Sequence, residues 1–137
     1  MRFMIMVRAN AQSESGALPE HDLVAAMTAY HEELAQAGVL LDANGLKPSA
    51  EGWRVRYTGG KRTIIDGPFA ETKELIAGYT LIQVRSREEA LEWARRFPPP
   101  FGDRADGEIE VRPLFEFEDF PPSESIERWR ELEANRH

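Results

Sequence analysis

Short stretches of alternating or continuous apolar residues predict four β-strands in this chain. In the first, Phe3, Ile5 and Val7 occupy every second position, which is the side-chain period of a strand. The other three span residues 39–41, 78–84 and 108–112. Two further strands, 53–58 and 62–65, flank Gly59-Gly60-Lys61 and predict a β-hairpin.

Helical spacing of apolar residues replaces alternation in two longer segments. From about Pro19 to Ala37 one apolar stripe predicts a helix that Gly38 ends. Its members are Leu23, Met27, Tyr30, Leu34 and Ala37. Ser86 begins a capping-box pattern with Glu89, which predicts a second helix running to about Phe97. The polar stretches 10–16 and 42–45 are expected to be loops.

A third helix is expected near the C-terminus, in the highly charged segment from Ser123 to about Asn135. A helix of this length is marginal in water, so it needs a surface to pack on. Ile126 and Trp129 are the expected anchors, and the surface belongs either to the same chain or to the other subunit of a dimer.

The order strand, helix, strand, hairpin, strand, helix, strand predicts a ferredoxin-like α+β domain. Its sheet should be antiparallel, with both main helices on one face. We place this domain at residues 1–120 and treat 121–137 as a charged helical extension.

The alternation also predicts which side chains lie on each face of the sheet. The helix-facing set is Phe3, Ile5, Val7, Ile82, Val84, Ile109 and Val111. The opposite set is Met4, Met6, Tyr79, Leu81, Gln83, Glu110 and Arg112. Because this second face is too apolar for water and too polar for a core, we expect a homodimer interface that encloses a cavity. The alternative is a face covered by the chain's own segment from Leu114 to Trp129.

Composition narrows the functional classes. The chain has 137 residues, 42% of them hydrophobic and 30% charged, which indicates one globular domain. Its net charge of −7 argues against a nucleic-acid partner. No cysteine is present, so thiol catalysis and thiolate metal sites are excluded. Without a signal peptide or an apolar stretch long enough to span a bilayer, the expectation is a cytoplasmic protein with no membrane partner.

Histidine offers few candidates for chemistry. His31-Glu32-Glu33-Leu34-Ala35 begins like a zinc-protease motif, but alanine occupies the position of the second imidazole, so no metal is expected. On the helical wheel His31 lies at the margin of the buried face, where it either packs or touches a ligand. His21 lies on the opposite side, toward solvent. Nucleotide-binding glycine motifs are absent, and no cofactor is expected.

The most distinctive segment is Asp66-Gly67-Pro68-Phe69-Ala70-Glu71-Thr72-Lys73-Glu74, followed by Gly78-Tyr79. This run closely resembles the signature of the DGPF group of YCII-related proteins. Weaker matches follow in the same order along most of the chain. They are Glu33-Leu34, Ala37 to Leu40, Gly45 to Pro48, Ala90 to Pro98 and Ile109 to Pro113.

The resemblance implies a ferredoxin-like fold that dimerises through its sheets, in a dimeric α/β barrel arrangement. Related YCII-type proteins include a dehydrochlorinase of aromatic degradation, and a His–Asp pair has been proposed as catalytic in some members. DGPF proteins are also often encoded beside extracytoplasmic-function sigma factors.

Two interpretations of Asp66 follow from its chemistry. In the structural one, Asp66 accepts backbone N–H bonds in an Asx-turn, Gly67 supplies unusual dihedral angles, Pro68 fixes the turn and Phe69 fills the core. In the functional one, its carboxylate lies at the mouth of the dimer cavity and acts as a general base.

Two functions therefore remain open. The first is a cofactor-independent isomerase or lyase, with Asp66 as base and His31 as acid. Its ligand contacts would be Arg112, Arg56, Tyr79, Lys73 and Glu74, the arginines holding an anionic substrate. The second is a non-catalytic binding or regulatory module, associated with sigma-factor signalling, whose cavity holds an unknown small molecule.

Overall fold

The computed structural model describes residues 1–136 of the chain and contains one four-stranded sheet, one two-stranded hairpin and four α-helices. The strands are β1 Arg2–Arg8, β2 Leu40–Gly45, β3 Trp53–Thr58, β4 Lys61–Asp66, β5 Ile76–Gln83 and β6 Ile109–Pro113. The α-helices are α1 Ala11–Glu14, α2 His21–Gln36, α3 Arg87–Arg95 and α4 Glu124–Ala134. Three single 3₁₀ turns lie at η1 Ser49–Glu51, η2 Thr72–Glu74 and η3 Phe117–Asp119.

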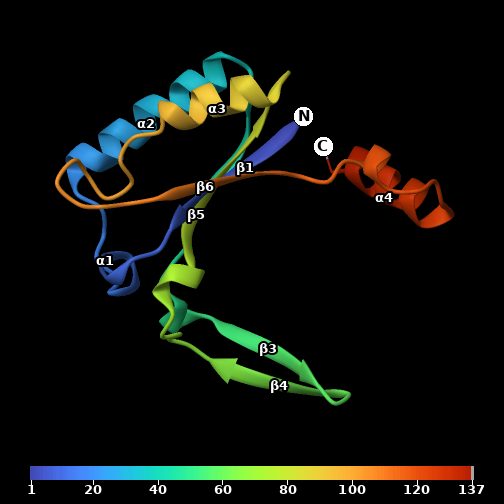
Figure 1. Ribbon diagram of the computed structural model, residues 1–137, viewed down its shortest axis with the longest axis horizontal. Coiled ribbons are helices and arrows are strands. Elements are labelled where there is room, and N and C mark those ends of the chain that lie inside the picture. Colours follow the sequence, from blue (N-terminus) through green and yellow to red (C-terminus); the bar gives the residue numbers. More distant parts are fainter. Residues whose placement is uncertain (137) are drawn as a thin grey trace.

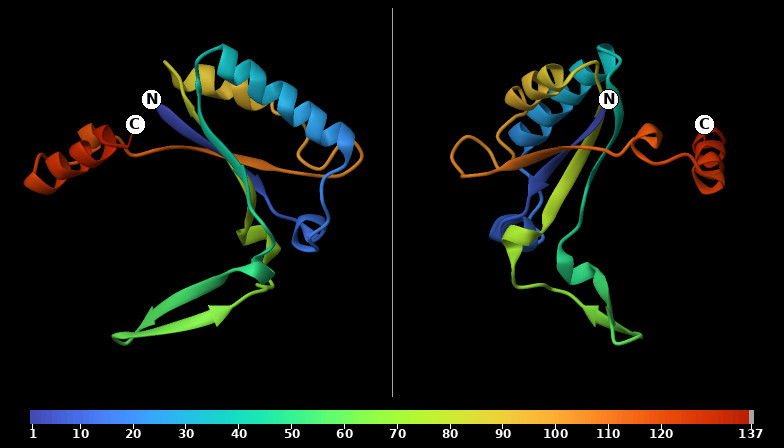
Figure 2. Two further views of the ribbon diagram at one scale, coloured as in Figure 1. Left: turned by 180° about the vertical axis from the view of Figure 1, so that it is seen from behind. Right: turned by 45° about the vertical axis from the view of Figure 1, so that its right-hand side comes forward.

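The main sheet is fully antiparallel, with strand order β2-β5-β1-β6. Helices α2 and α3 cover one face of it, as all views show (Figures 1 and 2). The α+β class, the antiparallel sheet and the placement of both main helices are therefore confirmed, and the architecture is consistent with a ferredoxin-like fold. No helix within residues 1–136 has the length and apolarity needed to cross a membrane.

The core lies between this sheet and its two helices. Four of the expected helix-facing residues, Phe3, Ile5, Ile82 and Val84, are buried, and the other three are half-buried. They pack against Tyr30 and Leu34 of α2 and Ala90 and Trp93 of α3. Burial of this cluster supplies the main favourable term in folding.

Local sequence signals set several element boundaries as expected. Gly38 has a φ of 75° directly after α2, and Gly59 and Gly60 have φ values of 59° and 77° in the β3–β4 turn. These left-handed conformations favour glycine. The Ser86 side chain caps α3 by accepting the N–H of Glu89.

Two expected loops are ordered elements instead. Residues 11–14 form α1, because Asn10 and Ser13 make a reciprocal capping box with distances of 2.9 and 3.0 Å. Strand β2 continues through the stretch 42–45, which was expected to be a loop. Pairing of Asp42 with Leu81 and of Gly45 with Gly78 holds this polar segment in the sheet, overriding its local preference.

The helix-free face of the sheet is half-buried in the protomer. Met4, Met6, Tyr79, Leu81 and Glu110 keep part of their surface exposed, and Gln83 and Arg112 are exposed. The C-terminal segment leaves the end of β6 and carries α4 beyond the sheet rather than across it (Figures 1 and 2). The expected C-terminal helix is confirmed, but docking by Trp129 within the protomer is wrong, since this side chain is 58% exposed.

Candidate functional site

A large cleft of about 960 Å³ lies between α2 and the end of the sheet formed by β2 and β5. This volume suits a drug-sized molecule. Most of its lining is apolar, and it includes Val7, Leu23, Val24, Met27, Leu40, Leu46, Phe97 and Phe101. The cleft therefore favours a largely hydrophobic ligand, and its few polar groups set the specificity.

His31 and Thr80 supply a polar pair in this wall, and both line the cleft. The Nε2 atom of His31 lies 2.8 Å from the Thr80 hydroxyl, and its Nδ1 atom lies 2.7 Å from the Met27 carbonyl oxygen. A carbonyl oxygen only accepts, so we assign the proton of the neutral ring to Nδ1. Nε2 is then the acceptor for the Thr80 hydroxyl, and the imidazole is oriented on both sides.

Aromatic rings hold the imidazole in place. Tyr30 and Phe97 meet the His31 ring edge to face, with centroids 5.4 and 6.3 Å away. The Tyr30 hydroxyl donates to the Trp93 carbonyl oxygen at 2.7 Å. Burial raises the pKa of Tyr30 to about 12, with a smaller opposing effect from the cation of Arg96. The site thus has a rigid wall on its core side.

Sequence reasoning found His31 but missed Thr80. Thr80 is only 3% exposed and is the buried polar residue of the described chain. It lies on the helix-facing side of β5, in the same alternation as Ile82 and Val84. A hydroxyl among apolar core positions was the available signal, because such a group needs a partner when buried.

Tyr79 is placed next to the cleft but its hydroxyl is already engaged. This hydroxyl donates to the Asp42 carboxylate at 2.8 Å and accepts from the Asn44 side-chain amide at 3.1 Å. Asp42 also accepts from the same amide at 3.3 Å. These contacts fix Tyr79 at the β2 edge of the sheet, where it contributes to the rim of the cleft.

Asp66 lies elsewhere in the protomer, at the end of β4, and it is not among the residues lining the cleft. Its side chain is exposed and accepts no hydrogen bond from residues 1–136. The expected Asx-turn is therefore wrong. The structure brings His31 and Thr80 together, but within one protomer it does not bring Asp66 into the same cleft.

The turn after Asp66 is held by a close backbone approach. Gly67 lacks a positive φ, so the expected conformational reason for glycine is wrong. A Cβ atom there would lie 1.8 Å from the Ser49 carbonyl oxygen. Ser49 also accepts the N–H of Phe69 at 3.0 Å and donates its own N–H to the Glu14 carboxylate at 2.8 Å. Residues 66–69 thus attach the hairpin to α1 and η1.

Phe69 does not fill the core. It is half-buried and stacks beneath the guanidinium of Arg54, which is 3.8 Å from the ring centre. This contact lies at the base of the hairpin. The segment is therefore explained largely by positioning of β3 and β4.

The remaining expected ligand residues lie on other surfaces. Arg56 is exposed on β3, and Arg112 is exposed on β6. Lys73 and Glu74 belong to η2, where the Lys73 carbonyl oxygen accepts a hydrogen bond from Arg8. Lys73 also lines a smaller hollow of about 440 Å³. Across residues 1–136 no three His, Asp or Glu side chains are close enough together to hold a metal ion.

Comparison with known proteins relates the chain to one protein family. The family model of the YCII-related domain matches residues 1–118. An uncharacterized protein of Rhizobium meliloti (strain 1021) is 36% identical over 88 residues, which cover 64% of this chain and 69% of that protein.

Proposed function

The chain belongs to the YCII-related family, and from this premise we propose that it binds a small, mainly apolar molecule with one polar group in the cleft beside His31. The observation that carries the proposal is the His31–Thr80 pair, which places hydrogen-bonding groups in a mostly apolar lining whose charged members are Glu32, Lys47 and Glu51. The apolar lining would bind the body of the molecule, and the pair would orient its polar group.

We propose further that His31 moves a proton on this molecule. A weakly acidic proton of the ligand passes to the Thr80 oxygen while the Thr80 hydroxyl proton passes to Nε2 of His31. The Met27 carbonyl then stabilises the resulting imidazolium through Nδ1–H. Return of the proton to another atom of the ligand completes an isomerisation, and loss of a leaving group completes an elimination. The chemistry needs no group beyond those of the chain.

The second candidate is binding without chemistry. It is favoured by the hydrogen bonds of both His31 nitrogens, which leave no free lone pair on the ring of this protomer. A regulatory role beside an extracytoplasmic-function sigma factor would need only such binding.

We also propose that the protein is a homodimer joined through the helix-free face of its sheet. Support comes from Met4, Met6, Tyr79 and Leu81, which are apolar or aromatic and half-exposed in the protomer. Surfaces of this composition are typical of subunit interfaces. Asp66 and the ligand residues outside the cleft, such as Arg112, would then meet the second subunit.

Mass spectrometry tests the binding proposal directly. Small molecules are extracted from the protein purified from cells and compared with those from Met27→Trp, which fills the cleft. Ala26→Trp is the matched control, because Ala26 is exposed on the same helix and outside the cleft. We expect a compound that the wild type and the control retain and Met27→Trp loses. Equal retention by all three would refute the cleft as the site.

Deuterium exchange then separates the two candidates. The compound is incubated with protein in D₂O, and incorporation of solvent deuterium is measured. Proton transfer predicts exchange with the wild type and little exchange with His31→Gln or Thr80→Val, measured at compound concentrations that saturate each variant. Binding without exchange in the wild type would leave the non-catalytic module as the function.

A further inference from the structure

One face of the β3–β4 hairpin is apolar and uncovered. Val55 pairs with Ile64, and Tyr57 pairs with Arg62, so these residues share a face with Trp53. The exposed fractions are 64% for Trp53, 69% for Tyr57 and 69% for Ile64. Exposed apolar residues are usually scattered singly, and a contiguous apolar strip of this kind marks an interaction surface.

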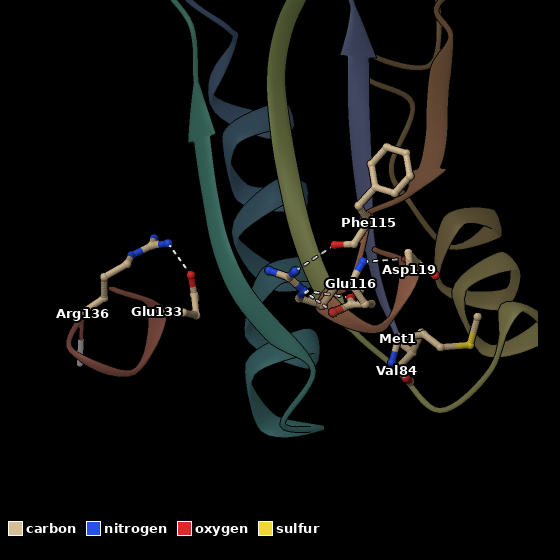
Figure 3. A network of polar contacts seen from close by, with 8 residues as sticks. Met1, Val84, Phe115, Glu116, Asp119, Glu133 and Arg136 are labelled. Atoms are coloured by element: carbon tan, nitrogen blue, oxygen red, sulfur yellow. Dashed lines mark hydrogen bonds and ion pairs between the residues drawn. The ribbon is translucent and has the colours of Figure 1, made fainter. Parts of the chain in front are cut away.

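The C-terminal segment, residues 115–134, also exposes large apolar side chains that nothing within residues 1–136 of the protomer covers. Phe115 is 75% exposed, and Trp129 and Leu132 are each 58% exposed. The start of this segment is fixed to the sheet, because the Arg2 guanidinium binds both the Glu116 carboxylate and the Phe115 carbonyl oxygen (Figure 3). The Phe115 ring points away from these polar contacts (Figure 3). The exposed apolar side chains of this segment therefore need a further surface to pack against.

The two segments carry opposite charge. The hairpin, residues 53–66, contains four basic residues, Arg54, Arg56, Lys61 and Arg62, and one acidic residue, Asp66, a net charge of +3. Arg62 and Asp66 lie on the apolar face, and the other three basic residues lie on the opposite face. Residues 115–134 contain seven acidic and two basic residues, a net charge of −5. In a chain whose total charge is −7, the hairpin is a positive segment and the C-terminal segment is a strongly negative one. Such complementarity orients and accelerates association.

We propose that the apolar face of each hairpin binds the C-terminal segment of a second copy of this chain. Within one protomer the hairpin and α4 point in different directions, and both lie on the helix-free side of the sheet (Figures 1 and 2). A symmetric pair repeats any contact between these two surfaces. Each subunit would give its C-terminal segment and receive its partner's, covering both apolar surfaces.

This pairing rests on the proposed homodimer but not on the proposed cleft, since the hairpin does not line the cleft around His31. The other occupant to consider is single-stranded nucleic acid, which binds basic surfaces bearing aromatic rings. The net charge of the chain opposes that partner, whereas the C-terminal segment supplies both the negative charge and the apolar side chains.

Cross-linking between different molecules tests the pairing, and the natural lack of cysteine makes the background clean. One preparation carries Ile64→Cys and a size tag, and the other carries Leu132→Cys without a tag. After mixing and subunit exchange, a short bismaleimide is added. We expect a linked product containing one tagged and one untagged chain. Replacing Leu132→Cys by Glu88→Cys, on the exposed side of α3, should abolish that product. No mixed product, or equal yield with the control, would overturn the proposal.

Sedimentation equilibrium supplies the second test. Ile64→Glu puts a charge on the hairpin surface without touching the core, so folding should be unaffected. We expect at least about a tenfold rise in the dimer dissociation constant, the size expected for an interface anchor. Glu88→Gln should leave it unchanged. An unaltered dissociation constant in Ile64→Glu would overturn the pairing. If that variant kept the dissociation constant but lost binding to a labelled single-stranded oligonucleotide, nucleic acid would be the occupant of the hairpin surface instead. Neither result bears on the extracted-ligand experiment with Met27→Trp, so the two proposals fail separately.

Discussion

Replacing Gly67 by alanine should disturb the attachment of the hairpin, because the new Cβ atom has no room. It would lie 1.8 Å from the carbonyl oxygen and 2.6 Å from the carbonyl carbon of Ser49. Both are backbone atoms, so rotation of a side chain cannot relieve the overlap. The strand base must move by more than 1 Å to reach an allowed contact.

The cost of that movement follows from the bonds it stretches. Gly67 donates its N–H to the Gly52 carbonyl oxygen at 3.0 Å, and Phe69 donates to the Ser49 hydroxyl at 3.0 Å. Two such bonds contribute roughly 1 kcal/mol each, and overpacking adds about 1–3 kcal/mol. If the hairpin stays attached, we therefore expect Gly67→Ala to lower the free energy of unfolding by about 3–5 kcal/mol.

Urea unfolding and hydrogen exchange together check this expectation. Gly52→Ala is the matched control, since its Cβ atom would meet only an ordinary contact at 3.8 Å and Gly52 has a φ of −120°. If Gly67→Ala relieves the overlap by releasing the hairpin, amides of β3 and β4 should lose protection while those of β1 keep it. Unchanged stability together with unchanged protection of the hairpin would refute the reasoning.

Three further outcomes are expected. Burial raises the pKa of Tyr30 to about 12 against an ordinary value of 10.0. The contribution of Tyr30 to the free energy of unfolding is therefore fully present below pH 10 and is lost as the pH rises toward 12. Urea titrations should detect a loss of about 2–3 kcal/mol over that interval, absent in Tyr30→Phe. Asp66→Asn should leave the melting temperature unchanged, because the carboxylate accepts no hydrogen bond within the described chain, and a loss of ligand binding in this variant would assign it a functional charge. Met6→Glu should convert the dimer to a 15.6 kDa monomer in sedimentation, because a buried unpaired charge costs several kcal/mol, and a persistent dimer would exclude the helix-free face as the interface.

The elements whose signals act over a few residues were predictable from the sequence alone. The period of two in Phe3, Ile5 and Val7 and the helical stripe through Leu34 reflect which side chains reach the core. The turn at Gly59 and Gly60 depends on backbone angles that few other residues adopt. These preferences are local, so the order of strands and helices, and with it the α+β class, followed from them.

Features that depend on residues far apart in the chain arise only from long-range contacts. Thr80 became part of a candidate site because folding placed its hydroxyl 2.8 Å from His31, 49 positions earlier. Gly67 is required by the passing backbone of Ser49 rather than by its own dihedral angles. Strand β2 includes polar residues because β5 supplies hydrogen-bond partners in register. Each of these features depends on which distant segments come into contact and how closely. A pattern that extends over a few neighbouring residues contains no information about such contacts.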